Sequence, residues 1–178
     1  MKTMTARATS TALMTLLLAA LAVSWPATAQ DKKVEKPAGS DLVGKPLSLE
    51  FTSVAGKPVS IASLKGKVVL IDFWATWCGP CVREIPNVKA AYDKLHKKGF
   101  EIVGISFDKD KEALTKFVAS HEMAWGQYFD GKGWENDFGR RFKIHSIPTM
   151  WLVDKKGILR DLNGRADLED KVAKLLAE

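Results

Sequence analysis

The chain has 178 residues, 46% hydrophobic and 27% charged, a composition typical of one soluble globular domain that excludes a disordered or fibrous protein. Its formal charge is +6, but no run of like charges is long enough for a nucleic-acid arm, so we expect no nucleic-acid partner. The only cysteines, Cys78 and Cys81, are too few for a disulfide-dense scaffold or for a zinc site built from two CxxC pairs.

Residues 1–29 have the pattern of a secretory signal peptide. Lys2 and Arg7 precede the apolar run 12–23, and Ala27-Thr28-Ala29 fits the small-x-small pattern of a cleavage site. The run is shorter than the roughly 20 residues that a membrane-spanning helix needs. We therefore predict a periplasmic or otherwise exported protein, whose charge falls to +4 once Lys2 and Arg7 are removed. An uncleaved segment that acts as a membrane anchor is the alternative.

The next segments predict a tether, a hairpin and a central strand. Residues 30–41 are polar and without a period, which indicates a flexible tether, so the folded domain is expected to span 42–178. Residues 47–51 and 58–61 are expected to form a short N-terminal β-hairpin. Residues 68–74 (VVLIDFW) are a continuous β-branched and aromatic run, typical of a strand buried on both faces.

The rest of the chain predicts helices and strands in alternation. Apolar residues recur every three or four positions after Cys78, which predicts an amphipathic helix that ends at Gly99. The later elements expected are a strand at 100–107, helices around 113–118 and 134–142, a hairpin of 149–153 with 158–162, and a closing helix at 168–176. Residues 125–134 are interpreted as loops and helix ends whose aromatic side chains belong to the core. The order favours an α/β fold with one mixed central sheet and helices on both faces.

The segment Trp77-Cys78-Gly79-Pro80-Cys81 stands between the buried strand and the long helix. A cysteine at a helix N-terminus faces unpaired amides and the positive end of the helix dipole, which stabilise its thiolate. Two cysteines three residues apart across one helical turn can form a disulfide without unwinding the helix. Cys78, at the exposed outer end, is therefore predicted to attack a partner's disulfide, and Cys81, better buried, to resolve the mixed disulfide.

The two cysteines have four other conceivable uses. A structural disulfide that closes so small a loop gains little chain entropy. The three histidines, His96, His121 and His145, do not stand at zinc-finger spacing from the cysteines, so no metal site is predicted. A copper-binding chaperone that uses both cysteines and His145 remains an alternative, because copper accepts soft sulfur ligands. The other alternative is a thiol peroxidase, for which Thr76 is weakly suggestive.

Residues 69–86, VLIDFWATWCGPCVREIP, resemble the active-site block of the thioredoxin superfamily. WATWCGPC followed by Glu84 and Pro86 is similar to the exported TlpA/ResA-like branch, and the similarity extends weakly over 42–178, including Ser146-Ile147-Pro148-Thr149. The resemblance implies a thioredoxin-like fold and thiol-disulfide exchange. The redox-active Cys78–Cys81 disulfide is then the only redox group expected, with no further cofactor.

Two carboxylates are candidates for acid-base work. Asp72 lies in the middle of the predicted central strand, where burial should raise its pKa, and it is interpreted as the proton acceptor for Cys81 or as an internally hydrogen-bonded residue. Thioredoxin-type relatives place Asp at this position, whereas many TlpA-like sequences place Asn. For Glu84 the resemblance implies acid-base help or partner recognition, although a Glu early in a helix is also favoured by the dipole.

The remaining candidates concern substrate binding. An X-Pro bond is only modestly biased toward trans. The resemblance implies that Pro148 is cis, stacks against the cysteine pair and leaves the backbone at Ile147 free to pair with a substrate strand. Trp77 is predicted to shield the first cysteine and, with Gly79 and Pro80, to contribute to the partner surface.

The Gly-Pro dipeptide between the cysteines is that of thioredoxin, whose potential is about −270 mV against about −120 mV for the oxidant DsbA, so we predict a reductant. An exported reductant needs electrons from a membrane donor. The resemblance implies a donor of the DsbD/CcdA type, with apocytochrome c or copper-site cysteines as substrates, and hence a role in cytochrome c biogenesis. We expect a monomer that acts on protein thiols and disulfides.

Overall fold

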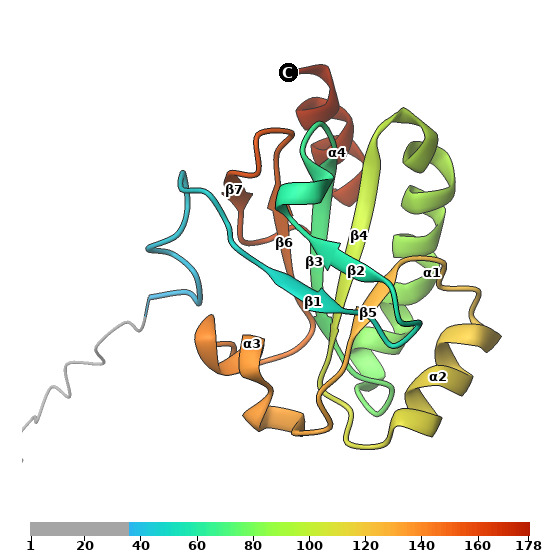
Figure 1. Ribbon diagram of the computed structural model, residues 1–178. Helices are drawn as coiled ribbons and strands as arrows, with labels where there is room; N and C mark the ends of the chain where they lie inside the picture. Colours follow the sequence, from blue (N-terminus) through green and yellow to red (C-terminus); the bar gives the residue numbers. More distant parts are fainter. Residues whose placement is uncertain (1–35) are drawn as a thin grey trace, which may run out of the picture. The chain divides into compact units, whose positions relative to one another are not determined.

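The structure is a computed structural model that describes residues 36–178, so the predicted signal peptide and the first six residues of the predicted tether lie outside it. A mixed sheet of five strands in the order β5-β4-β3-β6-β7 forms its centre (Figure 1). A separate antiparallel hairpin consists of β1 (Glu50–Thr52) and β2 (Pro58–Ser60). The α/β class, the mixed sheet and the N-terminal hairpin are thus confirmed.

The register of the central sheet brings distant segments to one end. The strands are β3 (Val68–Trp74), β4 (Phe100–Ser106), β5 (Gly126–Tyr128), β6 (Thr149–Val153) and β7 (Leu159–Asp161). Strands β3, β4 and β5 run parallel, whereas β6 is antiparallel to β3 and β7 to β6. Phe73 pairs with Thr149, so the start of β6 lies beside the carboxyl end of β3.

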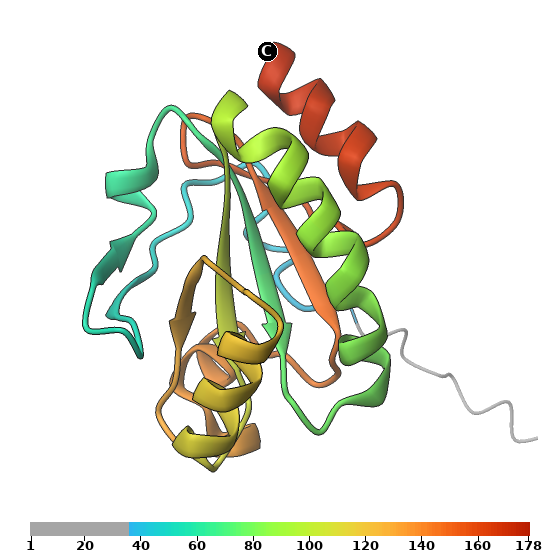
Figure 2. The same ribbon diagram turned by 90° about the vertical axis from the view of Figure 1, so that its right-hand side faces the viewer.

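Helices cover both faces of the sheet. They are α1 (Gly79–Leu95), α2 (Lys111–Ser120), α3 (Asp137–Arg141) and α4 (Leu168–Ala177). Figure 2 shows α1 and α4 side by side across one face. On the other face Phe73 contacts Phe142, the residue after α3, with ring centroids 6.2 Å apart. The long helix ends as expected, because a 3₁₀ turn at His96–Lys98 is followed by Gly99 in the left-handed conformation.

Residues 36–44 form hydrogen-bonded turns. The amide of Ser40 donates to the carbonyl of Pro37, and that of Leu42 donates to Gly39. Gly39 has a φ of +77° and lies so close to Trp151 that a Cβ at this position would be 2.6 Å from the indole ring. Packing against the core therefore begins before residue 42, where the folded domain was expected to start.

The interpretation of 125–134 as loops and helix ends was wrong in part, because β5 lies within this segment. The strand has only three residues, and its central Gln127 is polar and 1% exposed. The side chain of Gln127 lies against Gly104 of β4, where a Cβ would collide with it, and its Oε1 accepts a hydrogen bond from Trp74 Nε1 at 3.0 Å. A short strand around a buried glutamine lacks the apolar pattern by which strands are recognised.

The single helix expected at 134–142 is divided into two short pieces. Trp134 lies in a 3₁₀ turn, η3 (Gly133–Glu135), and Phe138 lies in α3. Between them Asn136 has an extended backbone, and its Oδ1 accepts a hydrogen bond from the amide of Gly139, as an N-cap does. The buried Asn136 therefore starts a new helix where the apolar spacing alone predicted a continuous one.

Candidate active site

The cysteines lie where β3 passes into α1. Cys78 is the N-cap of α1, and its Sγ accepts a hydrogen bond from the amide of Cys81 at 3.2 Å. The two cysteines form a disulfide, with their Cα atoms 5.2 Å apart. Pro80 lies in the first turn, where its missing N–H leaves no donor unpaired. The Sγ of Cys78 therefore faces a helix amide, the arrangement expected to stabilise a thiolate.

The two cysteines are less different in exposure than the sequence predicted. Cys78 is 6% exposed and Cys81 2%, so the expected exposed outer position of Cys78 holds only relative to Cys81. As the capping residue, Cys78 turns its sulfur inward toward the helix amide instead of outward to solvent. Trp77, immediately before it, is 53% exposed, so much of its side chain is accessible beside the cysteine motif.

A buried carboxylate that the sequence did not single out holds the loop before the cysteines. Asp108 is 2% exposed and accepts hydrogen bonds from the amide of Thr76 at 3.2 Å and from its hydroxyl at 2.5 Å. The hydroxyl of Ser106, at the end of β4, donates to Asp108 at 2.8 Å. The hydroxyl of Thr76 is therefore engaged by a carboxylate, which does not favour the peroxidase alternative.

Asp72 is buried and its pKa is raised, as its position in the central strand predicted. It is 1% exposed, and its Oδ1 has no hydrogen-bond partner within residues 36–178. Burial, and secondly the negative charge of Glu84, raise the pKa of Asp72 from 3.8 to about 7. A carboxyl group with such a pKa exchanges its proton near neutral pH, where a general acid or base is most effective.

Glu84 connects the buried carboxyl group of Asp72 to residues at the protein surface. Its side chain accepts hydrogen bonds from Arg165 Nε at 2.8 Å and from Asn87 Nδ2 at 3.1 Å. Arg165 precedes α4 and is half-exposed, so the ion pair joins α1 to the loop that leads into α4. No local sequence pattern indicates Arg165, because its partner lies 81 residues earlier.

A second cation lies over the cysteine motif itself. Arg83 is exposed, and its Nη1 would lie 3.5 Å from a Cβ at Gly79. A guanidinium beside the first helical turn favours negative charge there, which adds to the effect of the helix dipole.

Pro148 lies at the same end of the sheet as the cysteines, because it directly precedes the residue that pairs with the end of β3. The Ile147–Pro148 peptide bond is cis, as the resemblance implied. Among the described residues, no backbone hydrogen bond engages the amide or the carbonyl of Ile147. This stretch of backbone is therefore available to an incoming strand.

The structure does not assemble the three-ligand copper site considered from the sequence. Over residues 36–178, no group of three or more His, Cys, Asp or Glu side chains could hold a metal ion. His96 Nδ1 lies 3.1 Å from the carbonyl of Phe100, and the ring of His121 stacks on Phe117. His145 is exposed and lines a hollow with Lys143 and the turns at 36–41.

Within residues 36–178, no helix is both long and apolar enough to cross a bilayer.

Comparisons with known proteins agree with this geometry. The family model described as Redoxin matches residues 33–177. The thiol-disulfide oxidoreductase ResA of Bacillus thuringiensis subsp. konkukian is 30% identical over 128 residues, which are 70% of this chain and 72% of ResA. The crystal structure of the thioredoxin domain of a thiol-disulfide oxidoreductase from Bacteroides vulgatus has a TM-score of 0.67 and 30% identity, covering 75% of this chain and 97% of that domain.

A thiol:disulfide interchange protein of the thioredoxin family from Chlorobium tepidum TLS is also similar, with a TM-score of 0.62 and 27% identity over 80% of this chain and 98% of its own. The Redoxin match spans nearly all of the described residues and includes the cysteine pair, Asp72 and Pro148. The chain therefore belongs to the Redoxin family and is a TlpA/ResA-like member of the thioredoxin superfamily.

Proposed function

We propose that this protein is an exported thiol-disulfide oxidoreductase that reduces disulfides in other proteins through Cys78 and Cys81. The observation that carries the proposal is the disulfide between these residues at the start of α1, at the same end of the sheet as Pro148. The names of the relatives support the same reaction class.

The reaction consists of two exchanges. The Cys78 thiolate attacks one sulfur of the substrate disulfide, which forms a mixed disulfide and releases the other substrate sulfur as a thiolate. The Cys81 thiolate then attacks the Cys78 sulfur, which releases the second substrate thiolate and forms the Cys78–Cys81 disulfide. Two electrons pass from the protein dithiol to the substrate, whose two thiolates take up the protons that the dithiol gave up.

Asp72 is proposed to accept the proton of the Cys81 thiol in the second exchange. Its unpartnered Oδ1 and its pKa of about 7 support this role, because a carboxylate and a thiol can then share a proton near neutral pH. Glu84 is proposed to act on Asp72 through its charge, and Arg165 holds Glu84 in place. Trp77, Gly79, Pro80 and the backbone of Ile147 are proposed to contact the substrate.

The direction of electron flow and the location complete the proposal. The Gly-Pro dipeptide supports a reductant, and the predicted signal peptide, removed after Ala29, supports a periplasmic or other exported location. We propose that a membrane protein of the DsbD/CcdA type supplies two electrons to the oxidised protein. Apocytochrome c or copper-site cysteines are the proposed substrates of the monomer.

Trapping with cysteine variants tests the proposal. Cys81→Ser is expected to accumulate mixed disulfides with a disulfide-containing protein such as insulin, because the resolving thiol is missing, whereas Cys78→Ser is expected to form none. The reverse pattern would refute the assignment of roles. A reduction potential above about −180 mV, the value of protein disulfide isomerase, would overturn the reductant assignment. Tight copper binding without any insulin reduction would replace the proposal by the chaperone alternative.

A further inference from the structure

Two exposed tryptophans lie together beside the cysteine motif. Only three large hydrophobic side chains are exposed within residues 36–178, namely Val43, Trp77 and Trp134. Trp77 is 53% exposed and Trp134 46%, and their ring centroids are 6.1 Å apart. The sequence had assigned the aromatic residues of 125–134 to the core, which is wrong for Trp134. Exposed aromatic surface next to a reactive group is characteristic of an interaction site.

Trp134 is packed on one side and open on the other. Its ring lies edge to face against Phe107, with centroids 5.2 Å apart, and Phe107 is fully buried at the end of β4. Gly139 of α3 permits this packing, because a Cβ there would lie 2.6 Å from the ring of Phe107. The position of Trp134 is therefore determined by the core, although much of its surface faces solvent.

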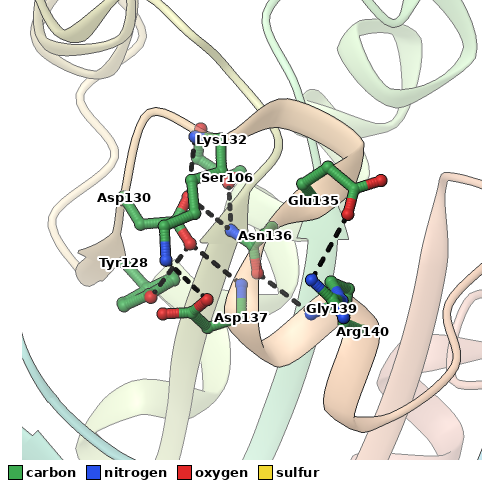
Figure 3. Close-up of polar contacts among 9 residues, drawn as sticks. All are labelled: Ser106, Tyr128, Asp130, Lys132, Glu135, Asn136, Asp137, Gly139 and Arg140. Carbon is green, nitrogen blue, oxygen red and sulfur yellow. Dashed lines mark hydrogen bonds and ion pairs between the residues drawn. The ribbon is translucent and has the colours of Figure 1, made fainter.

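A network of hydrogen bonds holds the turn that carries Trp134 (Figure 3). Asp130 accepts hydrogen bonds from the amide of Lys132 at 3.0 Å, from the amide of Asp137 at 2.9 Å and from the hydroxyl of Tyr128 at 3.2 Å. The fully buried Asn136 donates from Nδ2 to the carbonyl of Ser106 at 2.9 Å, which ties the turn to β4. A side chain held in this way loses little conformational entropy when it binds a partner.

Two cations beside the turn that carries Trp134 are paired with carboxylates. Lys132 pairs with Asp137 at 2.6 Å, and Arg140 pairs with Glu135 at 3.5 Å (Figure 3). The guanidinium of Arg83, which lies over Gly79, adds a positive charge beside the cysteines. Because Lys132 and Arg140 are already paired, the exposed aromatic rings are the main feature of the surface, which suits a large apolar side chain.

We propose that Trp77 and Trp134 together bind a large apolar side chain of the polypeptide substrate, adjacent in its sequence to the cysteine that Cys78 attacks. Trp134 is then a specificity-determining residue, supplied by a segment remote from the cysteine motif. This inference rests on the proposed function. It concerns which disulfides are preferred and not whether disulfides are reduced.

Three synthetic peptides with one intramolecular disulfide test the inference. They differ only in the residue next to one half-cystine, which is Leu, Ser or Lys, and oxidised glutathione serves as a disulfide without an apolar side chain. The measured quantity is kcat/KM for reduction of each peptide. We expect the wild type to prefer the Leu peptide over the Ser peptide by about tenfold, the effect of partly burying a leucine side chain against the two rings.

Trp134→Ala is expected to reduce this preference to about twofold or less, and Trp134→Phe to keep most of it, because a smaller aromatic ring remains. The matched control is Val43→Ala, which removes the third exposed hydrophobic side chain and should keep the wild-type preference. An unchanged preference in Trp134→Ala, or a wild type that prefers the Lys peptide, would overturn the inference alone. A wild type that reduces neither the peptides nor oxidised glutathione would overturn the proposed function as well.

Discussion

Replacement of Asp72 by asparagine tests the acid-base role of the buried carboxylate. Asparagine has nearly the same shape and cannot ionise, so the variant removes the charge with little change in packing. Asp72 is fully buried, and burial first and the charge of Glu84 second raise its pKa from 3.8 to about 7. The wild type must therefore hold a charged group in the interior above about pH 7, and the variant does not.

The size of the expected change in the free energy of unfolding follows from the linkage between folding and protonation. A rise from 3.8 to about 7 is about three pKa units, or about 4 kcal/mol. Because the pKa is higher in the folded state, the folded protein binds this proton more tightly than the unfolded chain. This contribution to stability is complete below about pH 3.8 and is lost as the pH rises through about 7. Relative to the wild type, Asp72→Asn should gain up to about 4 kcal/mol between about pH 4 and pH 8.

Urea unfolding of the oxidised protein across this pH range measures the effect, with the midpoint and slope recorded at each pH. In the reduced protein we also expect slower release of a trapped substrate by Cys81 at neutral pH, measured in a single turnover. Glu50→Gln is the matched control, because Glu50 is an exposed carboxylate on β1. Parallel stability curves for wild type and variant, together with unchanged release at every pH, would show that Asp72 is only structural.

Two further predictions concern contacts that connect distant segments. Arg165→Ala should raise the apparent pKa of Asp72 by up to about one unit, because the charge of Glu84 is then uncompensated. The pH profile of substrate release or an NMR titration measures it, with Arg165→Lys as the charge-conserving control, and a lower or unchanged pKa would contradict it. Gly104→Ala should destabilise the protein by about 1–3 kcal/mol, because the added methyl collides with Gln127. The urea midpoint measures this loss, which should be smaller when Gly104→Ala is made in a Gln127→Ala background, because the side chain that the methyl meets is then absent; a neutral single variant would disprove the close packing.

The sequence alone predicted the secondary-structure elements correctly where a local pattern and the tertiary environment agree. The run VVLIDFW became β3 with the predicted bounds, since a strand buried on both faces needs continuous apolar residues. The predicted hairpins and the closing helix also formed at the expected places. The failures at β5 and at the divided third helix share a cause. In both, a buried amide side chain, Gln127 or Asn136, makes hydrogen bonds to a distant strand that outweigh the local apolar spacing.

The residues themselves determined the chemistry, because two cysteines three positions apart at a helix start can exchange a disulfide in any protein that presents them. Only the folded chain decided what surrounds that pair. The parallel crossover of β3 and β4 brings Asp108 to the loop before the cysteines, and the antiparallel return of β6 places Pro148 at the same end of the sheet. Arg165 and Trp134 reach the site from segments whose own sequence patterns do not indicate it, since such contacts depend on distances between elements that periodicity does not encode.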